Sequence, residues 1–368
     1  MAVPTRFATP STVGPAAGLD KDRIVQQTDI DALVSRCSAV KTGYLSDPYA
    51  ELFLETSAPR DRRYPLINRG TYIRTIALDQ LVDGFLSQAP TAQKQIISLG
   101  AGSDTRFFRL AAANKSLRLL YHEFDFPQVT IRKIEAIKRH KELSSIISEF
   151  SSTGGQVFDD AAPGFQTDMR TGSLKSASYY IHPLDLRTLK PGTPLPEGID
   201  PKLPTLFISE CCLIYLSPTE TDDIFKWITT SFGQPSESNS NGVGILLYEP
   251  IGGDDPFGKV MVRNLSQRGI VLKTLQRYST LERQKERMRM LGFNSGMGAC
   301  DVNFIHDAWI GGDEKERIDK LELLDEREEW VLLAKHYCIA WGWVERSPSD
   351  QEGVFMFQNW TRFPVQQT

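Results

Sequence analysis

Cysteine and histidine are scarce in this sequence, which contains five residues of each type among 368. The cysteines are scattered, odd in number and never arranged as Cys-x-x-Cys, a pattern that favours a reducing compartment over a disulfide framework. No histidine lies at metal-ligand spacing from another histidine or cysteine, so the sequence predicts no metal site. We therefore expect a cytoplasmic protein that works without a metal ion.

A strong net charge and long apolar runs are also lacking. The formal net charge is −4 at pH 7 and the pI is about 5.8, whereas nucleic-acid binding needs a clustered positive field. No apolar run approaches the roughly 18 residues of a membrane span, and the N-terminus lacks the apolar core of a signal peptide. We therefore expect neither a nucleic-acid partner nor a membrane segment. The 40% share of hydrophobic residues allows a sizeable globular core.

Two segments precede the first expected strand. Residues 1–20 are rich in proline, alanine, threonine and glycine, which predicts a disordered leader. Residues 21–90 carry apolar side chains at helical spacing, and Thr28 or Asp29 is the expected N-cap of the first helix. One apolar stripe in this segment contains Ile73, Ala77, Leu81 and Phe85. We expect residues 21–90 to form a helical lid.

From Gln95 onward, short apolar segments alternate with helical or loop segments, which is the pattern of a mostly parallel, doubly wound α/β sheet. This α/β core, residues 91–368, would include a helical insertion at about 254–292, after the fifth strand. The expected strands occupy residues 95–99, 119–126, 179–186, 205–216, 242–249 and 337–344, and surface loops are expected at 151–164, 190–204 and 233–242.

Two charged segments carry further expectations. Residues 313–336 have an apolar stripe at helical spacing, which predicts one long helix with Asp313 as its cap. Residues 282–289 mix lysine, arginine and glutamate, so a solvated helix face is a better interpretation than a basic surface for nucleic acid.

The turn after the first expected strand is the first candidate binding feature. Gly100 and Gly102 let the backbone bend sharply and approach a ligand, and the helix that follows can direct free N–H groups toward it. The dinucleotide fingerprint needs a third glycine where this chain has Thr105, which argues against NAD and FAD. Because any strand-to-helix turn can contain two glycines, the turn alone does not define a cofactor.

Carboxylates follow the next three expected strands. Asp125 and Asp185 lie at the ends of the second and third expected strands, and Glu210 lies at the end of the apolar run TLFIS, residues 205–209. In a parallel sheet such ends line one ligand-binding crevice. Asp125 can accept hydrogen bonds from a ribose diol, although by itself it is equally compatible with a solvated loop. Acidic groups would repel a pyrophosphate and favour an adenosyl ligand with positive charge. S-adenosylmethionine, which has a sulfonium and an ammonium group, fits this set.

The carboxylate of that ligand needs a cation. Arg36 and Arg74 in the helical segment are the candidates, and Arg69 competes with them. Each arginine alone is compatible with an ordinary surface position. Arg74 is favoured because it lies just beside the apolar stripe, where a side chain can turn into a cleft.

These residues and their surroundings resemble the leucine carboxyl methyltransferases, which methylate the C-terminal leucine of protein phosphatase 2A catalytic subunits. The resemblance extends from about Asp29 to Trp343 and includes "NRGTYIRT", "IISLGAGSDTRFFRL", "EFDFP", "PTLFISECCLIYLSP" and "HYCIAWGW". It implies a class I S-adenosylmethionine-dependent methyltransferase core, Rossmann-like, with an N-terminal helical lid. The cofactor contacts that it implies are Arg36, Arg74, Gly100, Asp125, Asp185, Leu186 and Glu210; at Arg36 the family commonly has lysine.

The resemblance implies methyl transfer to a peptide α-carboxylate, which would form a methyl ester and S-adenosylhomocysteine. Such a carboxylate has a pKa of about 3.5 and is ionised at pH 7, so no general base is required. This agrees with a sequence that offers no convincing His-Asp or Cys-His pair. Tyr215, just past the fourth expected strand, is the candidate substrate contact, although an ordinary core-edge tyrosine is an equally good interpretation. We expect a monomer.

Three other functions stay open at this stage. One is an O-methyltransferase for a small molecule such as a polyketide. Another is methylation of transfer RNA, because a sister branch resembles this chain in its methyltransferase half; there a kelch-type propeller follows, and no repeat of about 50 residues is present here. The third is a phosphatase-binding protein without catalysis.

Overall fold

The computed structural model describes residues 18–55, 62–153, 164–232, 242–325, 327–345 and 355–367. Most of the predicted leader therefore lies outside the described residues. Helix α1 spans Gly18–Thr42, so the prediction that it begins at Thr28 or Asp29 is wrong. The helix starts earlier because its first turns have a surface to pack on: Ile24 lies against Gly269.

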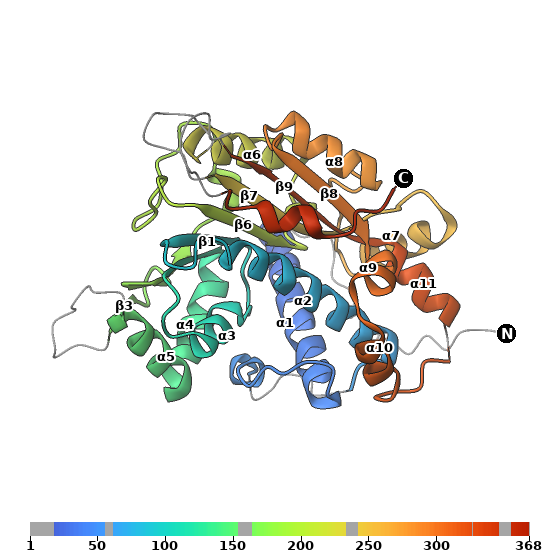
Figure 1. Cartoon of the computed structure of the whole chain (residues 1–368), viewed down its shortest axis with the longest axis horizontal. Helices are drawn as coiled ribbons and strands as arrows, with labels where there is room; N and C mark the ends of the chain where they lie inside the picture. The colour runs from blue at the N-terminus through green and yellow to red at the C-terminus, as the bar shows by residue number, and fades with distance from the viewer. Residues whose placement is uncertain are drawn as a thin grey trace.

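One nine-stranded sheet forms the centre of the described structure, in the order β3-β4-β5-β2-β1-β6-β7-β9-β8 (Figure 1). Strands β5, β2, β1, β6 and β7 pair in parallel, and β1 is buried at every position, as expected for a strand covered on both faces. These five strands are β1 (Lys94–Leu99), β2 (Leu119–Asp125), β5 (Tyr179–Pro183), β6 (Thr205–Glu210) and β7 (Val243–Pro250).

Both sides of this parallel centre are antiparallel. The strands concerned are β3 (Phe165–Asp168), β4 (Ser173–Ser176), β8 (Gly296–Asp301) and β9 (Tyr337–Val344). The predicted doubly wound α/β sheet is confirmed, whereas β3, β4 and β8 were not predicted. Strand β8 could not be recognised from its sequence, GMGACD, which contains two glycines. Glycine is needed at both positions because a side chain at Gly296 would collide with Trp343 on β9, and one at Gly298 would collide with Trp341.

Helices cover both faces of the sheet (Figure 1). One face packs on α6 (Pro218–Phe232) and α8 (Leu281–Met290). The other face packs on a larger set. This set contains α2 (Pro65–Leu86), α3 (Arg106–Ala113), α4 (Pro127–Arg139), α5 (Lys141–Thr153), α9 (Val302–Trp309), α10 (Gly312–Asp319) and α11 (Arg327–Lys335).

The helices of the predicted insertion and several short 3-10 turns complete the described part of the fold. Helix α7 (Pro256–Gln267) and α8 lie in the predicted insertion, and Asp255 and Thr280 cap them with side-chain oxygens. The 3-10 turns are η1 (Ala50–Phe53), η2 (Leu186–Thr188), η3 (Leu213–Tyr215) and η4 (Gln358–Arg362).

The predicted single helix over 313–336 is wrong, because the chain forms α10 and α11 with a break between them. Glu322 in this break turns inward and accepts a hydrogen bond from the buried Asn68 amide at 2.9 Å. Asp313 is not the cap, since the N-cap is Gly311. A tertiary hydrogen bond thus overrides a local helical pattern.

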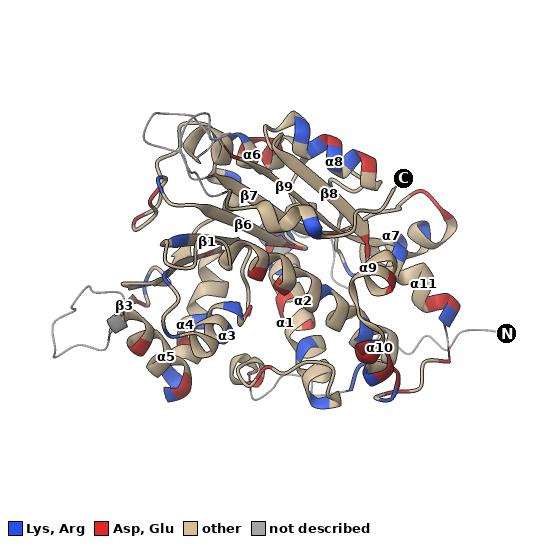
Figure 2. Ribbon diagram, in the orientation of Figure 1, with Lys and Arg blue, Asp and Glu red and all other residues tan. Residues whose placement is uncertain are grey.

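Acidic and basic residues intermix along α8 and α10 (Figure 2). The solvated face predicted for residues 282–289 holds for most of α8, yet Arg287 is an exception. Its side chain is fully buried and pairs with Glu249 at 2.9 Å, while its guanidinium lies over the rings of Phe225 and Tyr278.

The apolar stripe of α2 is completely buried, as its spacing predicted. Ile73, Ala77, Leu81 and Phe85 belong to the same core cluster as the strands β1 and β6. Trp360 of η4 packs on this helix and donates its indole N–H to Leu81 O at 2.7 Å. Helix α2 is therefore held rigidly over one end of the parallel strands. The division into a lid, 21–90, and a core, 91–368, stays a prediction.

Candidate active site

A cleft lies at the carboxyl ends of the central parallel strands, covered by α1 and α2. It consists of two adjoining cavities, a smaller one of about 180 Å³ and a larger one of about 470 Å³. Several residues line both cavities, which makes the cleft continuous: Val25, Gly100, Asp125, Phe126, Cys212 and Tyr215. All seven residues predicted to contact a cofactor line one cavity or both.

The glycine turn forms the floor where the two cavities meet. Gly100 and Gly102 have φ angles of +67° and +50°, in the left-handed region that glycine tolerates best. A Cβ atom on Gly100 would lie 2.3 Å from the Cys212 sulfur, and one on Gly102 would lie 2.4 Å from an Asp29 carboxylate oxygen. Both glycines are therefore required by conformation and by space, and the open backbone faces the cleft.

Asp125 is held at the end of β2 by two backbone groups. Its carboxylate accepts hydrogen bonds from the N–H of Gly102 and of Phe126, each at 2.7 Å. Burial raises the pKa of Asp125 to about 6, against the opposing effect of the Gly102 N–H, and the nearby Asp29 carboxylate adds to the rise. At pH 7 the group is still mostly ionised, so it can accept hydrogen bonds from a diol.

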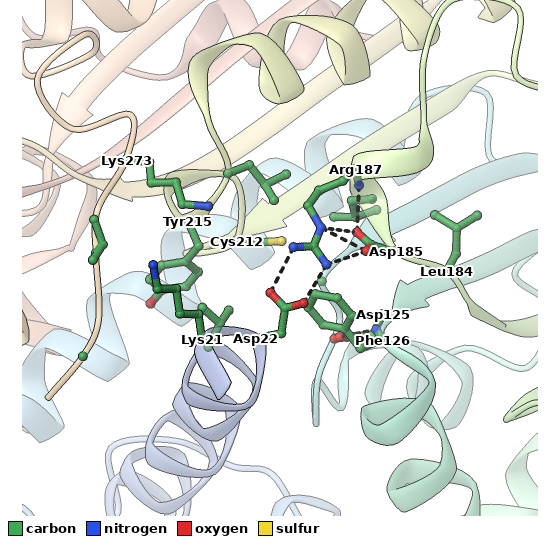
Figure 3. A pocket seen from close by; sticks show the side chains of 16 residues that line it. Lys21, Asp22, Asp125, Phe126, Leu184, Asp185, Arg187, Cys212, Tyr215 and Lys273 are labelled. Carbon is green, nitrogen blue, oxygen red and sulfur yellow. Dashed lines mark hydrogen bonds and ion pairs between the residues drawn. The ribbon is translucent and has the colours of Figure 1, made fainter. Parts of the chain in front are cut away.

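Asp185, labelled in Figure 3, lines the smaller cavity. Leu186 lines the same cavity. Asp185 caps η2 and accepts hydrogen bonds from the backbone N–H and guanidinium of Arg187. Burial acts to raise the pKa of Asp185, but these hydrogen bonds outweigh it and keep the pKa below its ordinary value. Arg187 also pairs with Asp22 of α1 at 2.7 Å, so an ion pair between α1 and η2 lines the smaller cavity.

Glu210 lies at the end of β6 with both carboxylate oxygens engaged. One oxygen accepts from Arg74 and the other from Arg106, each at 2.8 Å. Burial acts to raise the pKa of Glu210, but the two guanidinium groups outweigh it and hold the pKa below its ordinary value. The sequence suggested that Glu210 would meet a cation of the ligand. In the structure, arginines of the protein already occupy its oxygens.

Arg74 is the arginine that faces the cleft with groups to spare. Its Nε donates to Glu210, and its guanidinium stacks over the Tyr248 ring at 4.6 Å. Among the described residues its two terminal nitrogens have no hydrogen-bond partner. Arg36 also lines the larger cavity, but it is committed to Asp47 and Thr75.

The competing arginine, Arg69, turns away from the cleft. Its guanidinium donates to Asp319 of α10 at 2.6 Å, and it lines neither cavity. The preference for Arg74 over Arg69 in the sequence therefore agrees with the geometry.

Tyr215 on η3 stands at the junction and lines both cavities. Burial raises the pKa of its hydroxyl above the ordinary value, an effect that the neighbouring Thr28 of α1 offsets only in part. The side chain therefore stays protonated near pH 7. It reaches the cleft, as the candidate substrate contact should.

Sequence reasoning missed three charged residues that shape the site. Asp29 accepts hydrogen bonds at 2.7 Å from the N–H and from the hydroxyl of Ser103, which ties α1 to the glycine turn. Arg106 is buried and reaches Asp79, Asp104 and Glu210. Arg187 bridges Asp22 and Asp185. Arg106 could have been found, because it stands inside the quoted glycine motif.

Two negative findings concern the described residues alone. They contain no group of three or more His, Cys, Asp or Glu side chains arranged to hold a metal ion. Nor does any helix among them combine the length and the apolar character needed to cross a bilayer.

Comparison with known proteins connects this site to a family. The family model described as leucine carboxyl methyltransferase matches residues 24–229. Leucine carboxyl methyltransferase 1 of Aspergillus fumigatus is 44% identical over 92% of this chain and 87% of its own length. The Schizosaccharomyces pombe protein of the same name is 40% identical over 87% and 94%, and the Arabidopsis thaliana homolog 34% over 92% and 93%.

Solved structures of methyltransferases are similar at a low level. One is geranyl diphosphate C-methyltransferase from Streptomyces coelicolor in complex with S-adenosylhomocysteine, with 10% identity, a TM-score of 0.40 and coverage of 88% of this chain and 98% of that one. Another is the S-adenosylmethionine-dependent methyltransferase SibL, with 14% identity, a TM-score of 0.37 and coverage of 89% and 75%.

The chain belongs to the leucine carboxyl methyltransferase family. It is a methyltransferase, and its cofactor is S-adenosylmethionine, as the strand-end carboxylates predicted. The residues present fit that cofactor: the glycine turn leaves backbone open to the cleft, Asp125 offers an ionised carboxylate, and Arg74 offers free donors to an anion.

Proposed function

We propose that this chain transfers the methyl group of S-adenosylmethionine to the α-carboxylate of the C-terminal leucine of the protein phosphatase 2A catalytic subunit. The product would be a methyl ester, with S-adenosylhomocysteine released. The observation that carries the proposal is Arg74, held between Glu210 and Tyr248 with donors facing a cleft built on the glycine turn. The names of the relatives support the leucine carboxylate as the acceptor.

The proposed roles follow the positions of the residues along the cleft. Asp125, beside Gly100, would bind the ribose, and Asp185 with Leu186 would enclose the adenine in the smaller cavity. Arg74 would bind the carboxylate of the cofactor, with Arg36 adding positive charge nearby. Glu210 would act mainly by orienting Arg74, because its oxygens are already engaged.

The cofactor supplies an electrophilic methyl group on a sulfonium. The protein has to bind and orient the acceptor and to exclude water from it, because a fully solvated carboxylate is a weak nucleophile. An ionised carboxylate needs no base, so the absence of a His-Asp pair from the roles above is consistent with this reaction. We further propose that the enzyme is a cytoplasmic monomer; none of its five cysteines forms a disulfide, which supports a reducing compartment.

The test is incubation with labelled S-adenosylmethionine and intact phosphatase catalytic subunit. Label that is released by mild base, as expected for a methyl ester, should appear on the phosphatase. A phosphatase lacking its terminal leucine should remain unlabelled. Transfer of label to a purified metabolite or to transfer RNA instead would refute the proposal, and so would binding of the phosphatase without any transfer.

A further inference from the structure

The larger cavity contains a second group of residues that the cofactor roles do not use. Its far wall is apolar and comes from helices α2, α9 and α11, which are remote from the glycine turn in sequence. This wall contains Leu66, Ile67, Val302, Trp330 and Leu333. Two tyrosines, Tyr248 and Tyr337, line the larger cavity only, and Tyr248 lies against Arg74.

The two tyrosines form a stack on the Arg74 guanidinium. The guanidinium carbon lies 4.6 Å from the Tyr248 ring centre, and the Tyr248 and Tyr337 rings stack at 5.5 Å with an angle of 12°. The sheet fixes this arrangement, because Tyr248 pairs with Glu210 across β6 and β7, and Tyr337 pairs with Pro250 across β7 and β9. Backbone pairing thus places the two tyrosines side by side on one face of the sheet.

Both hydroxyl groups are available to a ligand. Within the described residues neither hydroxyl has a hydrogen-bond partner, and neither is sealed in the core in the way that the Tyr121 and Tyr179 hydroxyls are. Burial raises the pKa of both Tyr248 and Tyr337 above the ordinary value for tyrosine. Each therefore keeps its proton near neutral pH and presents an O–H donor to the cavity.

We infer that Tyr337, packed on Tyr248, donates a hydrogen bond to the substrate carboxylate that is to be methylated. This inference rests on the proposed function. A neutral O–H donor suits this task better than a second cation would. It can hold one carboxylate oxygen and leave the other one free to react, whereas a bidentate guanidinium would engage both oxygens. The apolar wall beside the tyrosines then receives an aliphatic side chain next to that carboxylate.

Tyr215 differs from this pair in position. It lines both cavities, so it stands at the junction with the cofactor half of the cleft. Tyr337 lies only in the larger cavity, on the side of the apolar wall. The substrate carboxylate would therefore bind between the two, with Tyr337 on its far side.

The experiment uses the full chain and the single-atom change Tyr337→Phe, which keeps the ring stack and removes the donor. With the phosphatase as substrate, we expect kcat/KM to fall about 10- to 100-fold, as for loss of one hydrogen bond to a charged group. The affinity for S-adenosylhomocysteine, measured by calorimetry, should stay within twofold of wild type. Tyr180→Phe is the matched control, because Tyr180 stacks on His182 away from the cleft, and it should behave as wild type.

A binding measurement makes the inference independent of turnover. Wild type saturated with S-adenosylhomocysteine should bind a peptide ending in leucine about 10-fold more tightly as the free acid than as the C-terminal amide. Tyr337→Phe should lose most of this preference. The inference would be overturned if Tyr337→Phe kept the preference for the free acid, or if it lost cofactor affinity to the same extent. The proposed function would still stand in that case, provided that the wild-type enzyme methylates the phosphatase. Failure of wild type to methylate or bind any such acid would instead refute the proposed function, and this inference with it.

Discussion

Two arginine–glutamate pairs join helices to the neighbouring strands β6 and β7 of this sheet, and they have different consequences. Arg74 pairs with Glu210 at the end of β6, and Arg287 pairs with Glu249 on β7; each guanidinium also stacks on a tyrosine ring. The side chains of the first pair are 24% and 19% exposed, whereas those of the second are 0% exposed. An arginine–glutamate pair of this kind can form part of a binding site only where one side of the pair faces a cavity.

The difference shows in what each arginine leaves unsatisfied. Among the described residues, Arg287 has two nitrogens buried without a partner and Glu249 has one such oxygen, so this pair is costly to maintain and serves to join α8 to the sheet. The free donors of Arg74 face the larger cavity and can be satisfied by a ligand. An arginine with hydrogen-bond donors that lack partners is unfavourable when it is buried in the core. When those donors face a cleft, they can bind a ligand.

The largest effect should come from breaking the sealed pair. Arg287→Met leaves the Glu249 carboxylate buried without a counter-charge, so we expect the free energy of unfolding to fall by about 3–5 kcal/mol. Urea unfolding followed by tryptophan fluorescence measures it. The double variant Arg287→Met/Glu249→Met removes both charges and should recover most of the loss, because a well-packed apolar pair can replace a buried ion pair. A loss below 1 kcal/mol in the single variant would contradict a sealed pair.

The open pair should instead affect binding. Arg74→Ala and Asp125→Ala should each weaken S-adenosylmethionine binding by about 10- to 100-fold, the expected effect of losing charged hydrogen bonds to the ligand. Glu210 keeps Arg106 as its partner in the Arg74 variant, so the fold should be maintained. Calorimetry measures the affinity and circular dichroism the fold.

Arg69→Ala is the matched control for Arg74→Ala, since Arg69 lies on the same helix and donates to Asp319 outside the cleft. It should leave the cofactor affinity unchanged. Wild-type affinity in both the Arg74 and the Asp125 variants would rule out the assigned site.

The pKa of Asp125 predicts a pH dependence that Glu210 should not share. Asp125 has a pKa of about 6 because it is buried, so it is ionised above pH 6 and becomes protonated as the pH falls through 6. If the ribose is bound by the ionised form, the affinity for S-adenosylmethionine should decrease about tenfold between pH 7 and pH 5. Glu210 stays ionised over this range, because its pKa is held below its ordinary value.

The isosteric variant Asp125→Asn tests the assignment of that pH dependence. It should bind the cofactor more weakly at pH 7 and with a nearly flat profile from pH 5 to pH 7. A profile in the variant as steep as that of wild type would assign the titration to another group.

The smallest effect should come from the Asp22–Arg187 ion pair that lines the smaller cavity. Asp22 and Arg187 are 30% and 31% exposed, and such pairs contribute about 0.2–1 kcal/mol. Asp22→Asn should weaken cofactor binding by no more than about fivefold, and the difference from wild type should shrink in high salt because the charges are screened. A larger effect that is insensitive to salt would mean that Asp22 contacts the cofactor itself.

The parallel centre of the fold could be predicted from the sequence because strands that are buried on both faces appear as short apolar runs. The segments 95–99, 205–216 and 242–249 are apolar runs, and each contains a strand of the observed sheet. Strand β8 is not such a run, because its glycines are selected to fit Trp341 and Trp343 on another strand. The break between α10 and α11 is equally hidden, since it depends on a hydrogen bond that the Asn68 amide donates to the Glu322 carboxylate.

The candidate site divides in the same way. The positions of Gly100, Asp125 and Asp185 followed from strand ends, and the structure brings them to one cleft. The roles of Asp29 and of Glu210 could not be read in this way. Asp29 appeared to be a helix cap and instead binds Ser103 at the glycine turn, while Glu210 appeared ready to meet a ligand and instead holds two arginines.

The sequence by itself determined the class of fold, the family and the cofactor. Apolar periodicity and the residue that follows each strand are local features of the sequence, and the parallel pairing expected of alternating strands and helices brings these strand ends to one edge of the sheet. Only the tertiary structure decided which charges face the cleft and which are sealed. Arg74 and Arg287 are both arginines on amphipathic helices, and the helices packed around each of them determine whether its free nitrogens meet a cavity or the core.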